Sequence, residues 1–303
     1  MSELDFQRVE LSVGEVAYAD EGDGPPVVLL HGFPTSSHLW RDLLPMLSVR
    51  MRALAPDLPG YGASERRAEA DSGIPALAAA VRELLDHLGI ERAALVGHDI
   101  GGAIAQILAL EGRAEALVVI DGVTIGVEPS EPMRVLQATP DRLATPELAE
   151  LTVRTAFDLG MGQRARLPEE ELEVFLRPWR EDPPALLRAA RALTETGLDG
   201  RREDLAALDI PAFVVWGEDD AFLPARHAEE LWETLPDAGI ALLPGCGHYV
   251  TEDAAETVLP LVSQFLRNRY LGQPGHDHAG GPVPVDLGVS FTRPDPPHEF
   301  VEE

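Results

Sequence analysis

The sequence predicts an α/β fold in which a doubly wound, mostly parallel sheet carries an inserted helical cap. Short apolar runs recur along the chain, and they lack the alternation of polar and apolar residues that marks a strand with one exposed face. Helical patterns lie between most of these runs, which is typical of a parallel sheet. One long stretch has helical patterns only and interrupts the alternation. The predicted strands are 27–30, 52–56, 93–97, 116–121, 212–217 and 240–244.

The first predicted element is an antiparallel hairpin over residues 6–22, ahead of the first parallel strand. A helix is expected over residues 74–89, because Leu77, Val81 and Leu84 recur on one side at helical spacing. These elements lead into the central strands of the predicted sheet.

Residues 122–207 contain helical patterns and no strand pattern, and the strands then resume at 212. We therefore assign 1–121 and 208–271 to the α/β core, and 122–207 to a helical cap inserted between two strands. Residues 272–303 read as a Gly- and Pro-rich C-terminal tail, extended or disordered, in which 282–291 is a candidate edge strand. Prolines are expected to divide the cap into short helices, and they stand at 129, 132, 140, 146, 168, 178, 183 and 184.

Composition narrows the classes of partner. All 24 basic residues are arginines, and the formal net charge is -28, so the surface should repel nucleic acid and anionic membranes. Cys246 is the only cysteine, which excludes an intrachain disulfide. Residues 1–7 are polar and show no signal-peptide pattern. We expect a cytoplasmic protein, monomeric or homodimeric, with a small apolar molecule as its partner.

Residues 95–103 read LVGHDIGGA and join a strand to a helix. A nucleophile on such a sharp turn has a strained backbone and needs small neighbours, which Gly97 and Gly101 supply. The following helix favours an anion at its first turn, so a carboxylate suits this position. Asp99 is the candidate nucleophile, although a simple helix-capping role would give the same short pattern.

Two loops at other strand ends add candidate partners for Asp99. The HGFP loop, 31–34, follows a strand and can aim the Phe33 N–H at the nucleophile, where it would form an oxyanion hole with the Ile100 N–H. The loop GCGHYVTED, 245–253, presents His248 as a general base.

A base of this kind needs a carboxylate to fix its tautomer. Asp220 in WGEDD, 216–220, is the preferred acid, three residues after Gly217 at the end of a strand, and Asp219 is a weaker candidate. The order Asp99, acid, His248 matches the known chain order for such triads and supports His248 as the base. Asp121, at the end of strand 116–121, remains the alternative acid.

Five segments together resemble the α/β-hydrolase superfamily over about residues 6–270. More narrowly, the chain looks like the branch with an aspartate nucleophile, which contains haloalkane dehalogenases, haloacetate dehalogenases and epoxide hydrolases. The segments are HGFPTSSHLWRDLLP (31–45), APDLPGYGAS (55–64), GHDIGG (97–102), WGEDD (216–220) and GCGHYVTED (245–253).

This resemblance implies a covalent mechanism without a metal or organic cofactor. Asp99 would attack an sp³ carbon to form an ester, and His248, oriented by Asp220, would activate the water that hydrolyses it. Phe33 and Ile100 would hold the oxyanion. Residues expected on the substrate pocket are Trp40, Trp179 and Tyr249.

The chain departs from each narrower group in one respect. Ile100 stands where haloalkane dehalogenases usually have a halide-binding tryptophan, and Phe33 stands where many have asparagine. The cap has no tyrosine to protonate an epoxide, and the helix after Asp99 has no arginine to bind a haloacid. The indole N–H of Trp179 in the cap is a candidate halide donor.

A dehalogenase acting on a haloalkane or haloacid is the preferred interpretation, and an epoxide hydrolase is the first alternative. A cofactor-free lyase or cyclase and a non-catalytic small-molecule binding protein remain open, whereas an ordinary esterase lacks its serine. Three tail histidines have irregular spacing that favours chance over a metal site: His276, His278 and His298.

Overall fold

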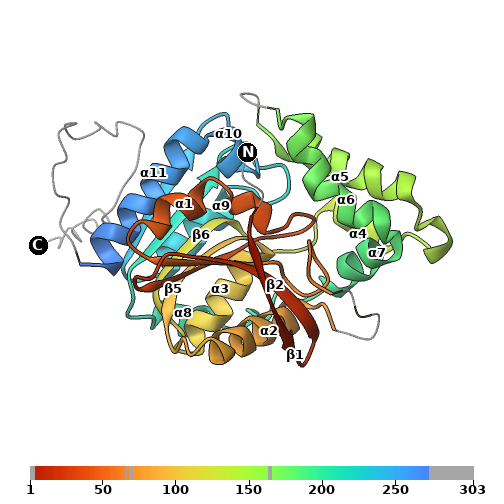
Figure 1. The fold of residues 1–303 in the computed structure, drawn as a ribbon. Coiled ribbons are helices and arrows are strands. Elements are labelled where there is room, and N and C mark those ends of the chain that lie inside the picture. Colours follow the sequence, from red (N-terminus) through yellow and green to blue (C-terminus); the bar gives the residue numbers. More distant parts are fainter. Residues whose placement is uncertain (1–3, 66, 68–70, 163–165, 273–303) are drawn as a thin grey trace, which may run out of the picture.

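A computed structural model describes residues 4–65, 67, 71–162 and 166–272, and within them an eight-stranded sheet forms the centre of the molecule (Figure 1). The strand order is β1-β2-β4-β3-β5-β6-β7-β8. Strands β3 to β8 are parallel, whereas β2 pairs antiparallel with both β1 and β4. The predicted α/β class and the mostly parallel sheet are confirmed. The strands are β1 (Phe6–Leu11), β2 (Gly14–Glu21), β3 (Pro26–Leu30), β4 (Arg52–Pro56), β5 (Ala93–Asp99), β6 (Ala114–Gly122), β7 (Ala212–Gly217) and β8 (Ala238–Leu243).

Helices cover both faces of this sheet, which explains why its central strands are apolar throughout. Helices α1 and α11 contact each other on one face, and α2, α3 and α8 follow one another on the other face (Figure 1). All six positions of β7 are buried, as this arrangement requires. The core helices are α1 (Leu43–Ser48), α2 (Ile74–His87), α3 (Ile100–Leu110), α8 (Arg202–Ala206), α9 (Arg226–Thr234), α10 (Val250–Asp253) and α11 (Ala255–Phe265). Short turns of other helix types are η1 (Ser37–Trp40) and η3 (Leu266–Tyr270).

Four helices and a short turn lie between β6 and α8 and gather at one end of the sheet, drawn in green in Figure 1. Prolines occupy the first turn of three of these helices and precede the fourth, as predicted. Pro178 differs, because it lies inside α6. The elements are α4 (Glu131–Gln137), η2 (Asp141–Leu143), α5 (Pro146–Gly160), α6 (Glu169–Glu181) and α7 (Pro183–Ala192). The predicted cap segment, 122–207, also includes the last residue of β6 and the core helix α8, so we call residues 123–201, between these two elements, the cap.

Within the described ranges, no helix combines the length and the apolar character needed to cross a bilayer. The tail prediction, with its candidate edge strand 282–291, lies outside the described residues apart from Gly272.

Candidate active site

Asp99 lies at the junction of β5 and α3, at the carboxyl edge of the sheet. Its φ is +51°, in the left-handed region that non-glycine residues rarely adopt. The turn closes because its neighbours lack side chains. A Cβ on Gly97 would lie 2.1 Å from the Gly101 carbonyl oxygen, and a Cβ on Gly101 would lie 2.1 Å from the Leu30 carbonyl oxygen. The glycines predicted for the turn are therefore sterically required.

The loop after β3 supplies donors to the Asp99 carboxylate. The Phe33 N–H donates to Oδ2 at 2.8 Å, and the Ile100 N–H also hydrogen-bonds the carboxylate. Gly32 permits this approach, since a Cβ there would lie 2.4 Å from the Cβ of Asp99. His31 in the same loop is fully buried, and its Nε2 accepts the Leu58 N–H at 2.9 Å. The structure thus gives His31 a role in holding the loop.

His248 follows β8 and contacts a carboxylate from the loop after β7. Its Nδ1 lies 2.9 Å from Oδ2 of Asp220, and both side chains are almost completely buried. The other oxygen of Asp220 accepts the N–H groups of Phe222 and Leu223, at 2.8 and 2.9 Å. Because the carboxylate accepts, Nδ1 carries the proton and a neutral His248 keeps Nε2 as its basic nitrogen.

Asp121, the alternative acid, bonds backbone groups instead of His248. Its Oδ1 accepts the Gly217 N–H at 2.8 Å, and the Val250 N–H also donates to its carboxyl group. The residue is fully buried and has a φ of +41°. Burial and the nearby charge of Asp220 raise its pKa well above the usual value. Asp121 therefore ties β7 to the loop that carries His248.

Opposing effects set the protonation of Asp99. Burial raises its pKa, whereas the positive charge of His248 and the N–H donors of Phe33 and Ile100 lower it. The net direction is upward.

His248 is balanced in a similar way. Burial alone would lower its pKa, but the charge and hydrogen bond of Asp220, together with the charge of Asp99, raise it overall. The two groups therefore influence each other's protonation.

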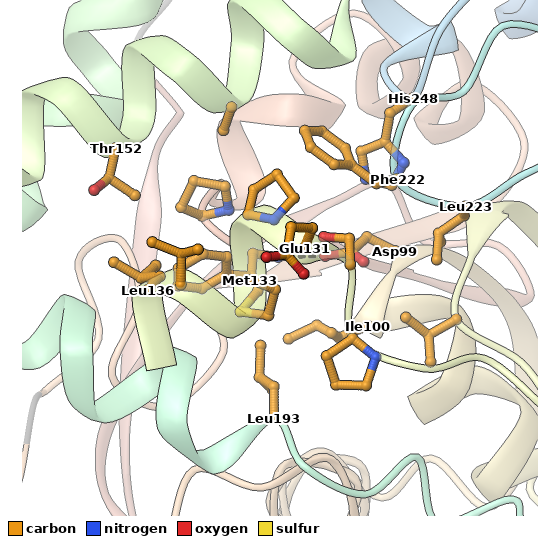
Figure 2. A pocket seen from close by; sticks show the side chains of 18 of the residues that line it. Asp99, Ile100, Glu131, Met133, Leu136, Thr152, Leu193, Phe222, Leu223 and His248 are labelled. Carbon is orange, nitrogen blue, oxygen red and sulfur yellow. Dashed lines mark hydrogen bonds between the residues drawn. The ribbon is translucent and has the colours of Figure 1, made fainter. Parts of the chain in front are cut away.

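A cavity of about 510 Å³ opens above Asp99, between the sheet edge and the cap. Phe33, Asp99, Ile100, His248 and Tyr249 all line it. Figure 2 shows Asp99, His248 and Phe222 together on one side, with Thr152 and Leu136 of the cap on the other. The predicted nucleophile, base and oxyanion-hole residues thus share one cavity.

Two of the expected pocket residues do not line this cavity, contrary to the prediction. Trp40 is fully buried in the core. Trp179 is about 1% exposed, and its indole Nε1 donates to the Pro34 carbonyl oxygen at 2.7 Å. Aromatic residues at helical spacing pack between elements as readily as they face a pocket, so sequence alone did not separate the two cases. Trp179 joins the cap to the loop that also carries Phe33.

The sequence did not reveal that the cap also holds the His248 loop. The carbonyl oxygen of Gly160, at the end of α5, accepts the His248 N–H at 2.6 Å. Asp253 adds a second link, since its Oδ2 accepts the N–H groups of Gly162 and Gly247 at 2.8 and 2.7 Å. In the sequence, only the acidic pair shortly after His248, in TED at 251–253, could have indicated that this loop is held by hydrogen bonds.

An ion-pair network makes a third link. Arg41 forms a bidentate pair with Glu252 at 2.7 and 2.8 Å, and its Nε lies 3.2 Å from Glu171 of α6. His38 lies 2.6 Å from the same Glu171 carboxylate. The cap, the loop after β3 and the loop after β8 therefore meet at one set of charges.

Among the described residues, no group of three or more His, Cys, Asp or Glu side chains is arranged to hold a metal ion. His276, His278 and His298 lie outside the described residues.

Comparison with known proteins identifies the family. The model of the family described as alpha/beta hydrolase fold matches residues 25–255, and the chain belongs to this family. Haloalkane dehalogenase 2 of Mycobacterium tuberculosis is 31% identical over 261 residues, which cover 82% of this chain and 90% of that protein. Family and relative together support hydrolase activity.

Solved structures agree on the fold. An alpha/beta hydrolase fold protein from Burkholderia ambifaria has a TM-score of 0.74 at 28% identity, covering 86% of this chain and 98% of its own. The epoxide hydrolase CorEH has a TM-score of 0.73 at 22% identity, covering 88% of this chain and 99% of its own. The second likeness concerns the fold alone.

Proposed function

We propose that this protein is a hydrolase that displaces a leaving group from an sp³ carbon through an ester on Asp99. One observation carries the proposal. The Asp99 carboxylate lies on the cavity wall with Oδ2 held by the Phe33 N–H at 2.8 Å. Within the described chain, no side chain donates to either oxygen of Asp99. Its second oxygen can therefore approach a substrate carbon, and an ionised carboxylate needs no base to do so.

In the first step, the carboxylate oxygen forms a bond to the substrate carbon. The carbon–halogen bond breaks, and halide leaves with the electron pair. In the second step, His248 takes a proton from water, and the resulting hydroxide attacks the carboxyl carbon of the Asp99 ester. The N–H groups of Phe33 and Ile100 stabilise the oxyanion. On collapse the ester C–O bond breaks, the His248 imidazolium gives its proton to the departing alkoxide to release the alcohol, and the Asp99 carboxyl group loses its proton to solvent. Asp220 stabilises the imidazolium that forms.

The coupling between Asp99 and His248 suits this sequence of steps. While Asp99 is ionised, its charge helps to raise the pKa of His248. Alkylation removes that charge, so the pKa of His248 falls when the residue must act as a base. Formation of the ester therefore favours the unprotonated form of His248, which can accept a proton from water.

Haloalkanes fit the cavity better than haloacids. Among the described residues that line it, none is an arginine or a lysine, so a substrate carboxylate would find no guanidinium or ammonium group there. The haloalkane dehalogenase relative supports the same choice.

Tyr249 favours an epoxide as a second candidate substrate. It lines the cavity, and its hydroxyl forms no hydrogen bond within the described part of the chain. Burial and the charges of Asp99 and Asp220 raise its pKa well above the usual value, so it stays a neutral donor. A phenol of this kind can donate to the oxygen of an opening epoxide.

The test is to trap the ester. His248→Gln should accumulate an alkyl-enzyme on Asp99, visible by intact mass after incubation with haloalkanes or epoxides, while Asp99→Ala should give none. Halide and diol release by the wild-type protein separates the two substrates, and Tyr249→Phe should slow epoxide opening more than halide displacement. If His248→Gln forms no adduct with any member of either set, the covalent proposal fails and a lyase, a cyclase or a binding protein takes its place.

A further inference from the structure

The outer part of the cavity wall is apolar and also exposed to solvent. Val135 of α4 and Leu151 of α5 line the cavity, yet they are 61% and 63% exposed. Leu159, near the end of α5, lines it as well and is 48% exposed. Apolar side chains that line a pocket and also reach solvent can extend a ligand-binding surface beyond that pocket. We call these three residues the apolar lip.

The cavity is large for a small haloalkane. Its volume of about 510 Å³ corresponds to roughly 15 to 20 water-sized groups, at about 30 Å³ for each. A two- or three-carbon substrate at Asp99 would leave most of this apolar space filled with water. A longer chain would displace that water and reach the apolar lip.

Three carboxylates also line the cavity to which the apolar lip belongs. Glu128, Glu131 and Glu195 line the cavity, and all three are exposed. Arg134 pairs with Glu131 at 3.0 Å, whereas Glu128 and Glu195 form no ion pair within the described chain. The uncompensated negative charges disfavour an anionic group at the distal end of a substrate.

We infer that the substrate is a long-chain, uncharged molecule whose reactive carbon lies at Asp99 and whose alkyl tail leaves the cavity over the apolar lip. This inference rests on the proposed function. It specifies the length of the substrate and the charge of its distal end, which the proposed reaction does not determine. The tail accounts for exposed leucines that a small substrate would not contact.

The experiment is a chain-length series of terminal bromoalkanes, from bromobutane to bromohexadecane, scored as kcat/KM by bromide release. Burial of each methylene is worth up to about four-fold, so kcat/KM should rise steadily with length and level off once the tail passes the lip. A bromoacid should react at least about ten-fold more slowly than the bromoalcohol of equal length, because its carboxylate meets Glu128 and Glu195.

Substitutions in the apolar lip test whether the dependence on chain length arises there. Leu151→Ser and Leu159→Ser should remove most of the gain for long substrates, so the slope of kcat/KM against chain length should fall. Val49→Ser is the matched control, since Val49 is 78% exposed and does not line the cavity. It should leave the whole series unchanged.

Three results would overturn the inference. These are a flat or falling dependence on chain length, equal rates for the acid and the alcohol, and lip variants that change the sedimentation mass of the protein but not the length profile. The last result would show that the lip contacts a second copy of the chain. Failure of the proposed function is distinct, because His248→Gln would then trap no ester with any length, bromobutane included.

Discussion

At the scale of single residues, the ionisation of Asp99, on which its proposed role as a nucleophile depends, reflects a balance between burial, hydrogen bonding and the charge of His248. Burial favours the protonated carboxyl, whereas the N–H groups of Phe33 and Ile100 and the charge of His248 favour the carboxylate. Only the carboxylate is a nucleophile. Ester formation should therefore follow the ionisation of Asp99.

The pH dependence of this step can be isolated in His248→Gln, where the ester accumulates. Because the pKa of Asp99 is raised, ester formation should fall at low pH with a midpoint above the value of about 3.9 for an exposed aspartate. Loss of the His248 charge should raise the midpoint further. Single-turnover mass spectrometry across a pH series measures it, and a midpoint at or below about 3.9 would contradict the assigned environment.

The two buried acids should respond differently to replacement by asparagine. Asp220→Asn should lower kcat by about 10³- to 10⁴-fold, since His248 loses the group that fixes its tautomer. Asp121→Asn should keep kcat within a few-fold, because its contacts are with the Gly217 and Val250 backbone. Steady-state kinetics with one substrate compares them, and equal losses would show that both acids serve His248.

Asp121 also gives a prediction for stability. Its pKa is raised on folding, so the stability that it contributes is fully present below the unfolded value of about 3.9 and is lost as pH rises through the folded pKa. Asparagine does not titrate. Asp121→Asn should therefore gain thermal stability relative to the wild type as pH rises above about 3.9 towards the folded pKa, measured as the difference in Tm between the two proteins. A difference that is constant with pH would contradict the raised pKa.

At the scale of elements, the strands were predicted to within a few residues and the side-chain contacts were not. Apolar runs and glycine turns are local signals, so β4 and β7 have the predicted bounds and Asp99 lies on the predicted turn. The link from Gly162 to Asp253 joins residues 91 positions apart. No local pattern encodes such a contact, and the packing of Trp40 and Trp179 was missed for the same reason.

The junction between α5 and the His248 loop should be sensitive to a single methyl group. A Cβ on Gly160 would lie 2.5 Å from Cε2 of Tyr249, so Gly160→Ala should displace the loop and lower kcat by at least about ten-fold. Gly73→Ala is the control, because its Cβ would come no closer than 3.2 Å to any atom, the nearest being on the Asp71 carboxylate. If Gly160→Ala keeps full activity, the loop does not depend on the end of α5.

At the scale of the whole molecule, the charge of -28 opposes folding through self-repulsion. Salt screens this repulsion over about 8 Å at physiological ionic strength. Tm should therefore rise between about 20 mM and about 300 mM NaCl. Choline chloride should give the same rise if screening is responsible, and a falling Tm would show that surface ion pairs outweigh the repulsion.

The hydrogen bond between the Gly160 carbonyl and the His248 N–H has a consequence for engineering. A chimaera that grafts a foreign cap onto this sheet would replace the carbonyl that fixes the base loop. Under the proposed mechanism, the graft would then move His248 as well as change the wall of the cavity. A graft that keeps the end of α5, Gly160 included, would retain this hydrogen bond.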